Sequence, residues 1–528
     1  MAANYINDQW VQKDSMGLGH AGDAVARMAL DVSPPFTIGV TGKWGCGKTS
    51  VMRRAFATLG GQPISQHLQL GENKQELDQD YSNAIENLLH SFGGRLKVLN
   101  WSDDLHDVAK QSLCIWYSPW QHQDAANPLI PLLQEIRAQY GFTRKILENG
   151  KQFNRQGGLA AWTLLEHAID AAISFTTGKP VKMAVGVAEN IRKAWHENNP
   201  ENLAKPSDGQ RFHLLFEDAV ENVLTDLLAV AEQKRLSEQK KASKVKSVAK
   251  PENISQHARL IVFIDDLDRC EEKAVVALLE AIKLYLGTHR CVFVLGVDDV
   301  AVGDALKRHW QGRSDDSNRE YLEKLFQATV QVPQPVYSKL QTLLESQLTA
   351  HGFPQDAVPG LAKDIQALLE PNPRKVKNFL NSLCANWQVL RCDAMHSEAN
   401  CRRLVMFQYL RNNHMPVWRL LEREPILLQL LHRVLVGSRE PITGHLSTDD
   451  LRMTEEIFSR SFAHVLKHDN ADEMKLHRSQ SLDAAVDKAI ERLDRRRSDQ
   501  YFVNWVNGGL AKDENLPAMY LQITNEEQ

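Results

Sequence analysis

Short apolar runs alternate with longer amphipathic stretches in the N-terminal part of the chain. Five of these runs have the length and composition of buried strands, and Pro333 follows the last of them. Strands that alternate with helices in this way predict an α/β fold, with a parallel sheet covered by helices on both faces. The five expected strands are Phe36 to Thr41, Leu113 to Tyr117, Leu260 to Ile264, Cys291 to Val297 and Thr329 to Val332.

Apolar residues recur at helical spacing between and after these runs. The stretch from Arg211 to Ala231 has the clearest such pattern, and nearly all of the chain beyond the last strand follows it. We therefore expect helical insertions between strands and a largely α-helical C-terminal region. The other helices expected around the strands are Asp23 to Leu30, Ser50 to Phe56, Pro128 to Tyr140 and Ala274 to Leu286.

These patterns divide the chain into a sheet-forming core, two insertions and two helical regions. The longer insertion ends in a segment rich in Lys and Ser at 234–250. That composition predicts a solvated linker, and a basic arm that touches nucleic acid is the alternative. The expected divisions are a core in three pieces at 1–57, 112–140 and 255–335, insertions at 58–111 and 141–254, a helical lid at 336–438 and a C-terminal helical segment at 439–528.

The composition is that of a soluble globular protein, because 43% of the 528 residues are hydrophobic and 24% are charged. The net charge of -4 gives no overall basic field for nucleic acid. The seven cysteines are scattered without a CxxC pair, so neither disulfides nor a zinc site are expected. No signal peptide is evident, and no apolar run reaches the ~20 residues of a membrane-spanning helix. We therefore expect a cytoplasmic protein without a transmembrane segment.

A glycine-rich loop follows the first expected strand and opens a helix. It matches the pattern GxxxxGK[ST], whose backbone N–H groups surround phosphate oxygens at a helix N-terminus. In such a loop Lys48 reaches the β- and γ-phosphates, and the Thr49 hydroxyl binds Mg²⁺. The residues expected to bind the nucleotide are Gly42, Lys43, Trp44, Gly45, Cys46, Gly47, Lys48, Thr49 and Ser50.

A phosphate-binding loop of this kind needs a second strand that ends in a carboxylate. The run LIVFIDDLDR supplies one, with Asp265 as the expected Mg²⁺ ligand and Asp266 as the group that positions or activates water. Adjacent residues of a strand point to opposite faces, so the two carboxylates are expected to do different work. Their roles exchange if the strand ends one residue later.

Three more charged residues near the strand ends are candidates for the same chemistry. Asp268 and Arg269 form either a charge pair near the γ-phosphate, with Arg269 acting in its own subunit or across an interface, or a structural ion pair. Asp298 follows the fourth strand, where it either senses the γ-phosphate or caps the next helix.

Taken together, these residues resemble the KAP P-loop NTPases. The resemblance covers most of residues 14–57, 112–138 and 255–385, and the motifs occur in the family's order. It rests on IGVTGKWGCGKTSVMRRAF, IWYSPWQHQD, LIVFIDDLDRCEEKAVVALLEAIKLYL, CVFVLGVDDVAVGDAL, YLEKLFQATVQVP and NPRKVKNFLN.

The resemblance implies a P-loop NTPase sheet of the additional-strand, catalytic-glutamate type. In that type another strand lies between the P-loop strand and the acidic strand, and the strand before Asp298 is the candidate. Where many related NTPases have Glu, this chain has Asp266. Many family members carry transmembrane helices between these motifs, but the insertion here is not apolar enough to span a membrane.

The family also suggests roles for residues outside the loop and the acidic strand. Trp120 is expected to pack beside the nucleotide, and Arg374 either reaches the γ-phosphate from the lid or is an exposed arginine at a helix start. The implied function is that of a Mg²⁺-dependent ATPase that couples nucleotide state to conformational change or assembly. The implied setting is a bacterial anti-phage defence complex, with a protein partner or effector and a homo-oligomer.

Two other functions stay open at this stage. The chain could be a nucleotide-gated scaffold with little hydrolysis, because Asp266 has a shorter reach than Glu. It could also be a nucleic-acid-stimulated motor, with the linker 234–250 as its sequence support. The pair His464 and His468 has metal-ligand spacing, but Val465 stands where an HExxH motif has Glu, so a solvated helix face is expected.

Overall fold

The computed structural model describes the three pieces of the sheet, most of the helices around them and most of the C-terminal helices. Of the sequence predictions, the insertion at 58–111 lies almost wholly outside the described residues, as does His468. The described residues are 16–61, 112–122, 125, 127–147, 155–177, 208–242, 258–284, 286–309, 315–389, 397–437, 446–466 and 482–508.

Contacts divide the chain into two compact units, which are described separately. The first contains the sheet and comprises 19–44 and 48–333, and the second comprises 1–18, 45–47 and 334–528.

A five-stranded parallel sheet forms the centre of the first unit, as the sequence predicts. Its order is β2-β3-β4-β1-β5. The strand β4 therefore lies between the P-loop strand β1 and the acidic strand β3, which confirms the additional-strand arrangement. The strands are β1 (Phe36–Thr41), β2 (Leu113–Tyr117), β3 (Leu260–Ile264), β4 (Cys291–Val297) and β5 (Ala328–Gln331).

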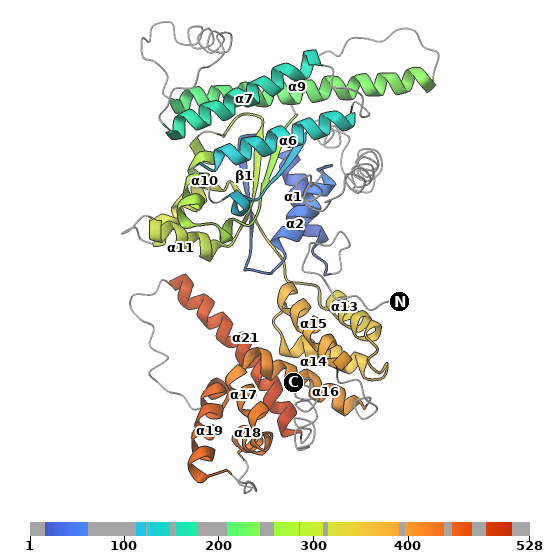
Figure 1. Cartoon of the computed structure of the whole chain (residues 1–528), viewed down its shortest axis with the longest axis vertical. Helices are drawn as coiled ribbons and strands as arrows, with labels where there is room; N and C mark the ends of the chain where they lie inside the picture. The colour runs from blue at the N-terminus through green and yellow to red at the C-terminus, as the bar shows by residue number, and fades with distance from the viewer. Residues whose placement is uncertain are drawn as a thin grey trace. The chain divides into compact units, whose positions relative to one another are not determined.

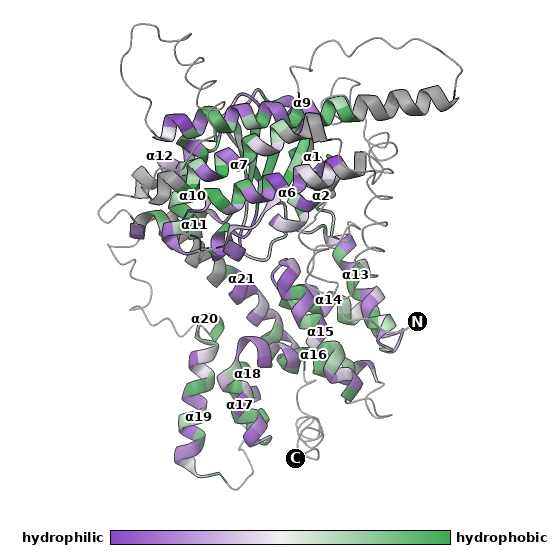
Figure 2. Cartoon of the chain, turned by 45° about the horizontal axis from the view of Figure 1, so that its top comes forward, coloured by the Kyte–Doolittle hydropathy of each residue, from purple (hydrophilic) through white to green (hydrophobic). Residues whose placement is uncertain are grey.

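Helices cover both faces of the sheet, with α1 and α2 on one side and α10 and α11 on the other (Figure 1). The central strands β3 and β4 are buried at every position, which explains why they are apolar throughout instead of alternating. Figure 2 shows mixed hydrophobic and hydrophilic colouring along α6 and α10, as expected of helices that pack one face on a core. These helices are α1 (Gly19–Asp31), α2 (Lys48–Thr58), α6 (Leu129–Leu147), α10 (Glu272–Leu284), α11 (Asp299–His309) and α12 (Asp315–Leu325).

An aromatic cluster joins α2 to the sheet. The ring of Phe56 meets Trp116 of β2 and Phe263 of β3 edge-on, at centroid distances of 5.5 and 5.4 Å. Trp116 and Phe263 stack on one another at 5.9 Å. Because α2 begins at the glycine-rich loop, this packing fixes the loop against the two strands that end nearest the acidic residues.

The long insertion forms two described helices, α7 (Arg155–Thr177) and α9 (Asp208–Ala242), which pack side by side (Figure 1). Sequence analysis expects a linker from 234, but α9 continues to Ala242. The reason is that Gln, Lys, Arg, Glu and Ala are all good helix formers. The rest of that linker lies outside the described residues.

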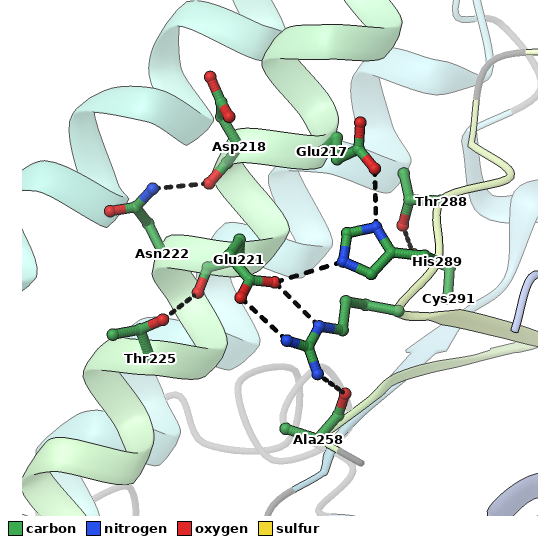
Figure 3. Close-up of polar contacts among 10 residues, drawn as sticks. Glu217, Asp218, Glu221, Asn222, Thr225, Ala258, Thr288, His289 and Cys291 are labelled. Atoms are coloured by element: carbon green, nitrogen blue, oxygen red, sulfur yellow. Dashed lines mark hydrogen bonds and ion pairs between the residues drawn. The ribbon is translucent and has the colours of Figure 1, made fainter. Parts of the chain in front are cut away.

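Polar contacts tie α9 to the sheet at the start of β4 (Figure 3). The guanidinium of Arg290 donates two hydrogen bonds of 2.9 Å to the carboxylate of Glu221, and it contacts the Ala258 carbonyl oxygen at 3.5 Å. His289 pairs with Glu217 at 2.7 Å. The insertion is thus anchored at the amino ends of β3 and β4, away from the ends that carry the acidic motif.

No described helix of the chain is both long enough and apolar enough to cross a membrane.

The second unit is a bundle of helices with one apolar core. It confirms the prediction of a largely α-helical C-terminal region. Its helices are α13 (Tyr337–Ala350), α14 (Val358–Leu368), α15 (Pro373–Val389), α16 (Glu398–Asn413), α17 (Met415–Arg423), α18 (Leu427–Val436), α19 (Thr448–Ser461), α20 (Ala463–Leu466) and α21 (Leu482–Asn507).

A buried carboxylate holds α21 in this bundle. Asp499 accepts hydrogen bonds from the Tyr409 hydroxyl at 2.6 Å, from His414 Nε2 at 2.7 Å and from His464 Nε2. Burial opposes the charge of Asp499, but these donors outweigh it and hold the pKa of the carboxyl well below its usual range. The expectation that His464 faces solvent is therefore wrong, because its partner is far away in the sequence.

We expect Asp499→Asn to destabilise the protein by about 3 kcal/mol at pH 7, because the buried donors lose their charged acceptor. The lowered pKa means that this carboxylate contributes stability above its unfolded pKa of about 4 and loses it as the pH falls further. The loss caused by the substitution should therefore shrink below about pH 4. Urea unfolding at several pH values checks this, with Asp494→Asn on the same helix as the control. An equal loss at pH 7 and pH 3 contradicts it.

Candidate functional site

The predicted site residues of the first unit lie at the carboxyl ends of neighbouring strands. Gly42 follows β1, Asp265 follows β3 and Asp298 follows β4. Because the strands are parallel, these ends meet at one edge of the sheet, which is where α/β proteins bind ligands.

The glycine-rich loop connects β1 to α2 through backbone conformations that favour glycine. Gly45 has φ of 81° and Gly47 has φ of 108°, in the region where a side chain is strained. The N–H of Gly42 donates to the Val297 carbonyl oxygen at 3.2 Å, so the start of the loop is fixed to the end of β4. The loop then leads into α2 at Lys48, which places a helix N-terminus beside it.

Lys48 is buried at the first position of α2, with only 7% of its surface exposed. Its ammonium donates to the Gly42 carbonyl oxygen at 2.8 Å and lies 3.4 Å from that of Lys43. It also pairs with the carboxylate of Asp268 at 3.6 Å. The ammonium is therefore held over the loop by three oxygen atoms.

Asp265 is buried directly after β3, and its N–H donates to the Tyr117 carbonyl oxygen at 3.0 Å. Burial, together with the charge of Asp266, raises the pKa of its carboxyl to about 6. A hydrogen bond from the Thr49 side chain acts in the opposite direction. Thr49 and Asp265 are thus in direct contact, although they are far apart in the sequence.

A glycine on the neighbouring strand makes room for this carboxylate. A Cβ at Gly296 would lie 3.1 Å from Asp265 Oδ1 and 2.8 Å from the sulfur of Met52. Any larger residue would displace the side chain of Asp265 or that of Met52 on α2. The close approach of Asp265 and Met52 therefore explains the glycine at position 296 of β4.

Asp266 is the only described residue other than glycine with a positive φ, at 57° with ψ of 31°. Asp and Asn tolerate this left-handed conformation better than most residues, yet it still costs free energy. The carboxylate of Asp266 pairs with Arg269 Nε at 2.9 Å and accepts from the Ser118 hydroxyl at 3.4 Å. The guanidinium of Arg269 lies 5.4 Å from the ring centre of the exposed Trp120.

Sequence analysis did not identify Arg53 as part of this cluster. Its guanidinium lies 3.6 Å from the ring centre of Trp116. Burial lowers the pKa of Arg53 to about 10, and the nearby charges of Asp265 and Asp266 partly offset this. Arg53 lies four residues after Thr49, on the same face of α2, and that spacing was the available signal.

Two predicted residues have other described contacts. The carboxylate of Asp298 lies 3.4 Å from the N–H of Ala301 and so caps α11. Arg374 is in the second unit, in the first turn of α15, where its N–H lies 3.1 Å from the Asn372 side-chain oxygen and 3.4 Å from the carbonyl oxygen of Gly45 in the glycine-rich loop. The Asp298 contact agrees with the capping alternative, whereas Arg374 starts a helix with its backbone against the loop, and its role at the γ-phosphate stays a prediction.

The Thr49 hydroxyl and the Asp265 carboxylate are suitable ligands for Mg²⁺. Both offer oxygen atoms, which this hard cation prefers, and a P-loop site uses one or two protein ligands beside phosphate oxygens and water. Burial disfavours the ionised form of Asp265, and a bound divalent cation would compensate its negative charge. Among the described residues, no group of three or more His, Cys, Asp or Glu side chains could hold a metal ion elsewhere.

We expect Asp265→Asn to raise the free energy of unfolding measured without nucleotide or metal, by about 3 kcal/mol at pH 8. A raised pKa means that the carboxyl contributes stability below its unfolded pKa and loses it as the pH rises through about 6. The ionised group thus destabilises the fold at pH 8, and the difference should vanish near pH 4. Urea unfolding with EDTA tests this, with the exposed Asp304→Asn as the control. A less stable Asp265→Asn at pH 8 would contradict it.

Comparisons with known proteins address the family directly. A sequence profile described as the KAP family P-loop domain matches residues 23–387. No curated protein matches the chain. A solved structure of the Aeropyrum pernix ORC2 protein (ADPNP-ADP complexes) is 12% identical over 93% of each chain, with a TM-score of 0.30, which is too low to carry an argument. The profile match spans the glycine-rich loop, the whole sheet and the acidic strand, so the chain belongs to the KAP family of P-loop domains.

Proposed function

We propose that the protein is a Mg²⁺-dependent ATPase with its reaction centre between the glycine-rich loop and the end of β3. The observation that carries this proposal is the contact between Thr49, at the start of α2, and the buried Asp265. Thr49 and Asp265 both belong to the first unit, and a P-loop nucleotide site needs one residue of each kind to hold the metal ion. Membership of the family supports nucleotide binding.

Each residue of the centre has a proposed part in binding. The backbone N–H groups from Gly42 to Ser50 surround the phosphates, and Lys48 offsets their negative charge. Thr49 and Asp265 hold the metal ion, which when bound neutralises charge on the transferred phosphoryl group. Placement and electrostatics then provide most of the rate enhancement.

The carboxylate of Asp266 is the proposed group that orients or activates the attacking water. Its left-handed backbone and its contacts with Arg269 and Ser118 fix the direction of the carboxylate. A water-positioning group gains from such restraint, because the entropy of alignment is lost before the reaction begins. Arg269 is a positioning residue in this scheme, within its own chain.

Several finer roles are proposals that rest on the family alone. They are the preference for ATP over GTP, γ-phosphate sensing by Arg374, a homo-oligomer, and coupling of nucleotide state to a conformational change or assembly. The bacterial anti-phage defence complex, with a protein partner or effector, also belongs here. γ-Phosphate sensing by Asp298 is likewise a proposal, and it rests on the position of Asp298 after β4. The nucleic-acid-stimulated motor keeps only the composition of 234–250 in its favour.

A second candidate is a nucleotide-gated scaffold that binds ATP and hydrolyses it very slowly. The observation that favours it is the ion pair between Asp266 and Arg269, because a carboxylate that is already engaged by a guanidinium is less available to a water molecule. Turnover separates the two candidates.

Phosphate release from Mg-ATP is the test of the proposal. We expect Lys48→Ala to lose both ATP binding and turnover, because the charge that faces the phosphates is gone. Asp266→Asn should bind ATP normally and lose at least about 100-fold in turnover, since general-base assistance has that size. Asn is a suitable replacement because it also accepts the left-handed backbone.

The exposed Asp304→Asn is the matched control and should behave as the wild type. Turnover that survives in Asp266→Asn contradicts the proposed role of Asp266. Tight ATP binding without turnover in the wild type contradicts the ATPase and favours the nucleotide-gated scaffold. No nucleotide binding in the wild type contradicts both.

A further inference from the structure

Asp268 pairs with the Lys48 ammonium, the group proposed to face the phosphates. Its carboxylate lies 3.6 Å from the Lys48 ammonium, and about nine-tenths of both side chains is buried. An ion pair shielded from water to this extent interacts more strongly than a pair on the surface. The proposed nucleotide site uses Lys48, Thr49, Asp265 and Asp266. It assigns no role to the third carboxylate, that of Asp268.

The turn after β3 explains how Asp268 reaches Lys48. Asp266 adopts the left-handed conformation, and the 3₁₀ turn Leu267–Arg269 follows at once. Leu267 is fully buried and fixes the turn in the core. As a result the carboxylates of Asp266 and Asp268, two residues apart, contact different partners, Arg269 and Lys48.

The charges named around the site balance. Lys48, Arg53 and Arg269 are positive, and three aspartates oppose them. Arg269 is paired with Asp266, and Arg53 interacts electrostatically with Asp265 and Asp266. Among these three cations, Lys48 is the one that pairs with Asp268. Removal of the Asp268 charge therefore leaves one extra positive charge beside the glycine-rich loop. The aspartates are Asp265, Asp266 and Asp268.

We propose that Asp268 is a built-in competitor of the phosphates for Lys48, which limits nucleotide affinity and speeds nucleotide release. This inference rests on the proposed nucleotide site. A phosphate that approaches Lys48 meets an ammonium that is already neutralised, and it is repelled by the carboxylate at the same time. The ligands affected share one chemistry, which is a di- or triphosphate chain, whatever base it carries.

The charge of Asp268 opposes the binding of phosphates. Loss of the Asp268 charge should strengthen binding of Mg-ADP and Mg-ATP by about tenfold, because a unit charge a few ångströms from the phosphates acts through partly buried surroundings. Most of the change should appear as slower dissociation, as is usual for changes within a binding site. A residue with a merely structural role would weaken binding on substitution.

The test measures the dissociation constant and dissociation rate of Mg-ADP by displacement of a fluorescent ADP analogue. The variants are Asp268→Asn and Asp268→Ser, which remove the charge, and Asp268→Glu, which keeps it. Glu271→Gln is the control, since it removes one negative charge from an exposed position three residues away. Inorganic pyrophosphate with Mg²⁺ serves as a second probe that carries no base.

We expect the two uncharged variants to bind Mg-ADP and pyrophosphate about tenfold more tightly, with Asp268→Glu and Glu271→Gln close to the wild type. Unchanged or weaker binding in a folded uncharged variant overturns the inference while the nucleotide site stands. Equal tightening in Glu271→Gln also overturns it, because the effect would then be one of overall charge. If the wild type binds neither probe, the proposed function fails and this inference fails with it.

Discussion

The structure of the first unit depends on a carboxylate that is buried although burial disfavours its charged form. Asp265 ends the acidic strand with almost no access to water, and burial raises the pKa of its carboxyl to about 6. Its neighbours accommodate that cost: Gly296 leaves it space, and Thr49 donates a hydrogen bond to it. Functional sites often keep such a penalty, because a cofactor or substrate compensates it on binding.

Asp499 in the second unit is the opposite case, and the comparison separates stability from function. Both carboxylates are buried, but three hydrogen-bond donors surround Asp499 and hold its pKa below the usual range. Its charge therefore stabilises a helical bundle. Asp265 lacks such compensation, although Arg53 acts on it electrostatically. A buried acid alone does not mark a reaction centre; the direction of its pKa shift adds the needed information.

Sequence analysis predicted the strands, the P-loop and the acidic strand, because each is a local pattern whose residues are neighbours in the chain. The position of β4 between β1 and β3 came from the family resemblance and is confirmed. The contacts of Lys48, Arg53 and His464 could not be predicted, since their partners Asp268, Trp116 and Asp499 come from other parts of the chain. The left-handed Asp266 was also missed, because only the turn that follows it imposes that conformation. The roles assigned to the site residues stay predictions.

Asp265 and Thr49 are the proposed protein ligands of the metal ion in the nucleotide complex. Calorimetric titration of ATP into the protein, with Mg²⁺ and again with EDTA, tests this assignment most directly. We predict that Mg²⁺ strengthens ATP binding to the wild type by at least about tenfold, and that Asp265→Asn loses most of this difference while it still binds ATP without metal. An unchanged dependence on Mg²⁺ in Asp265→Asn would contradict the assignment.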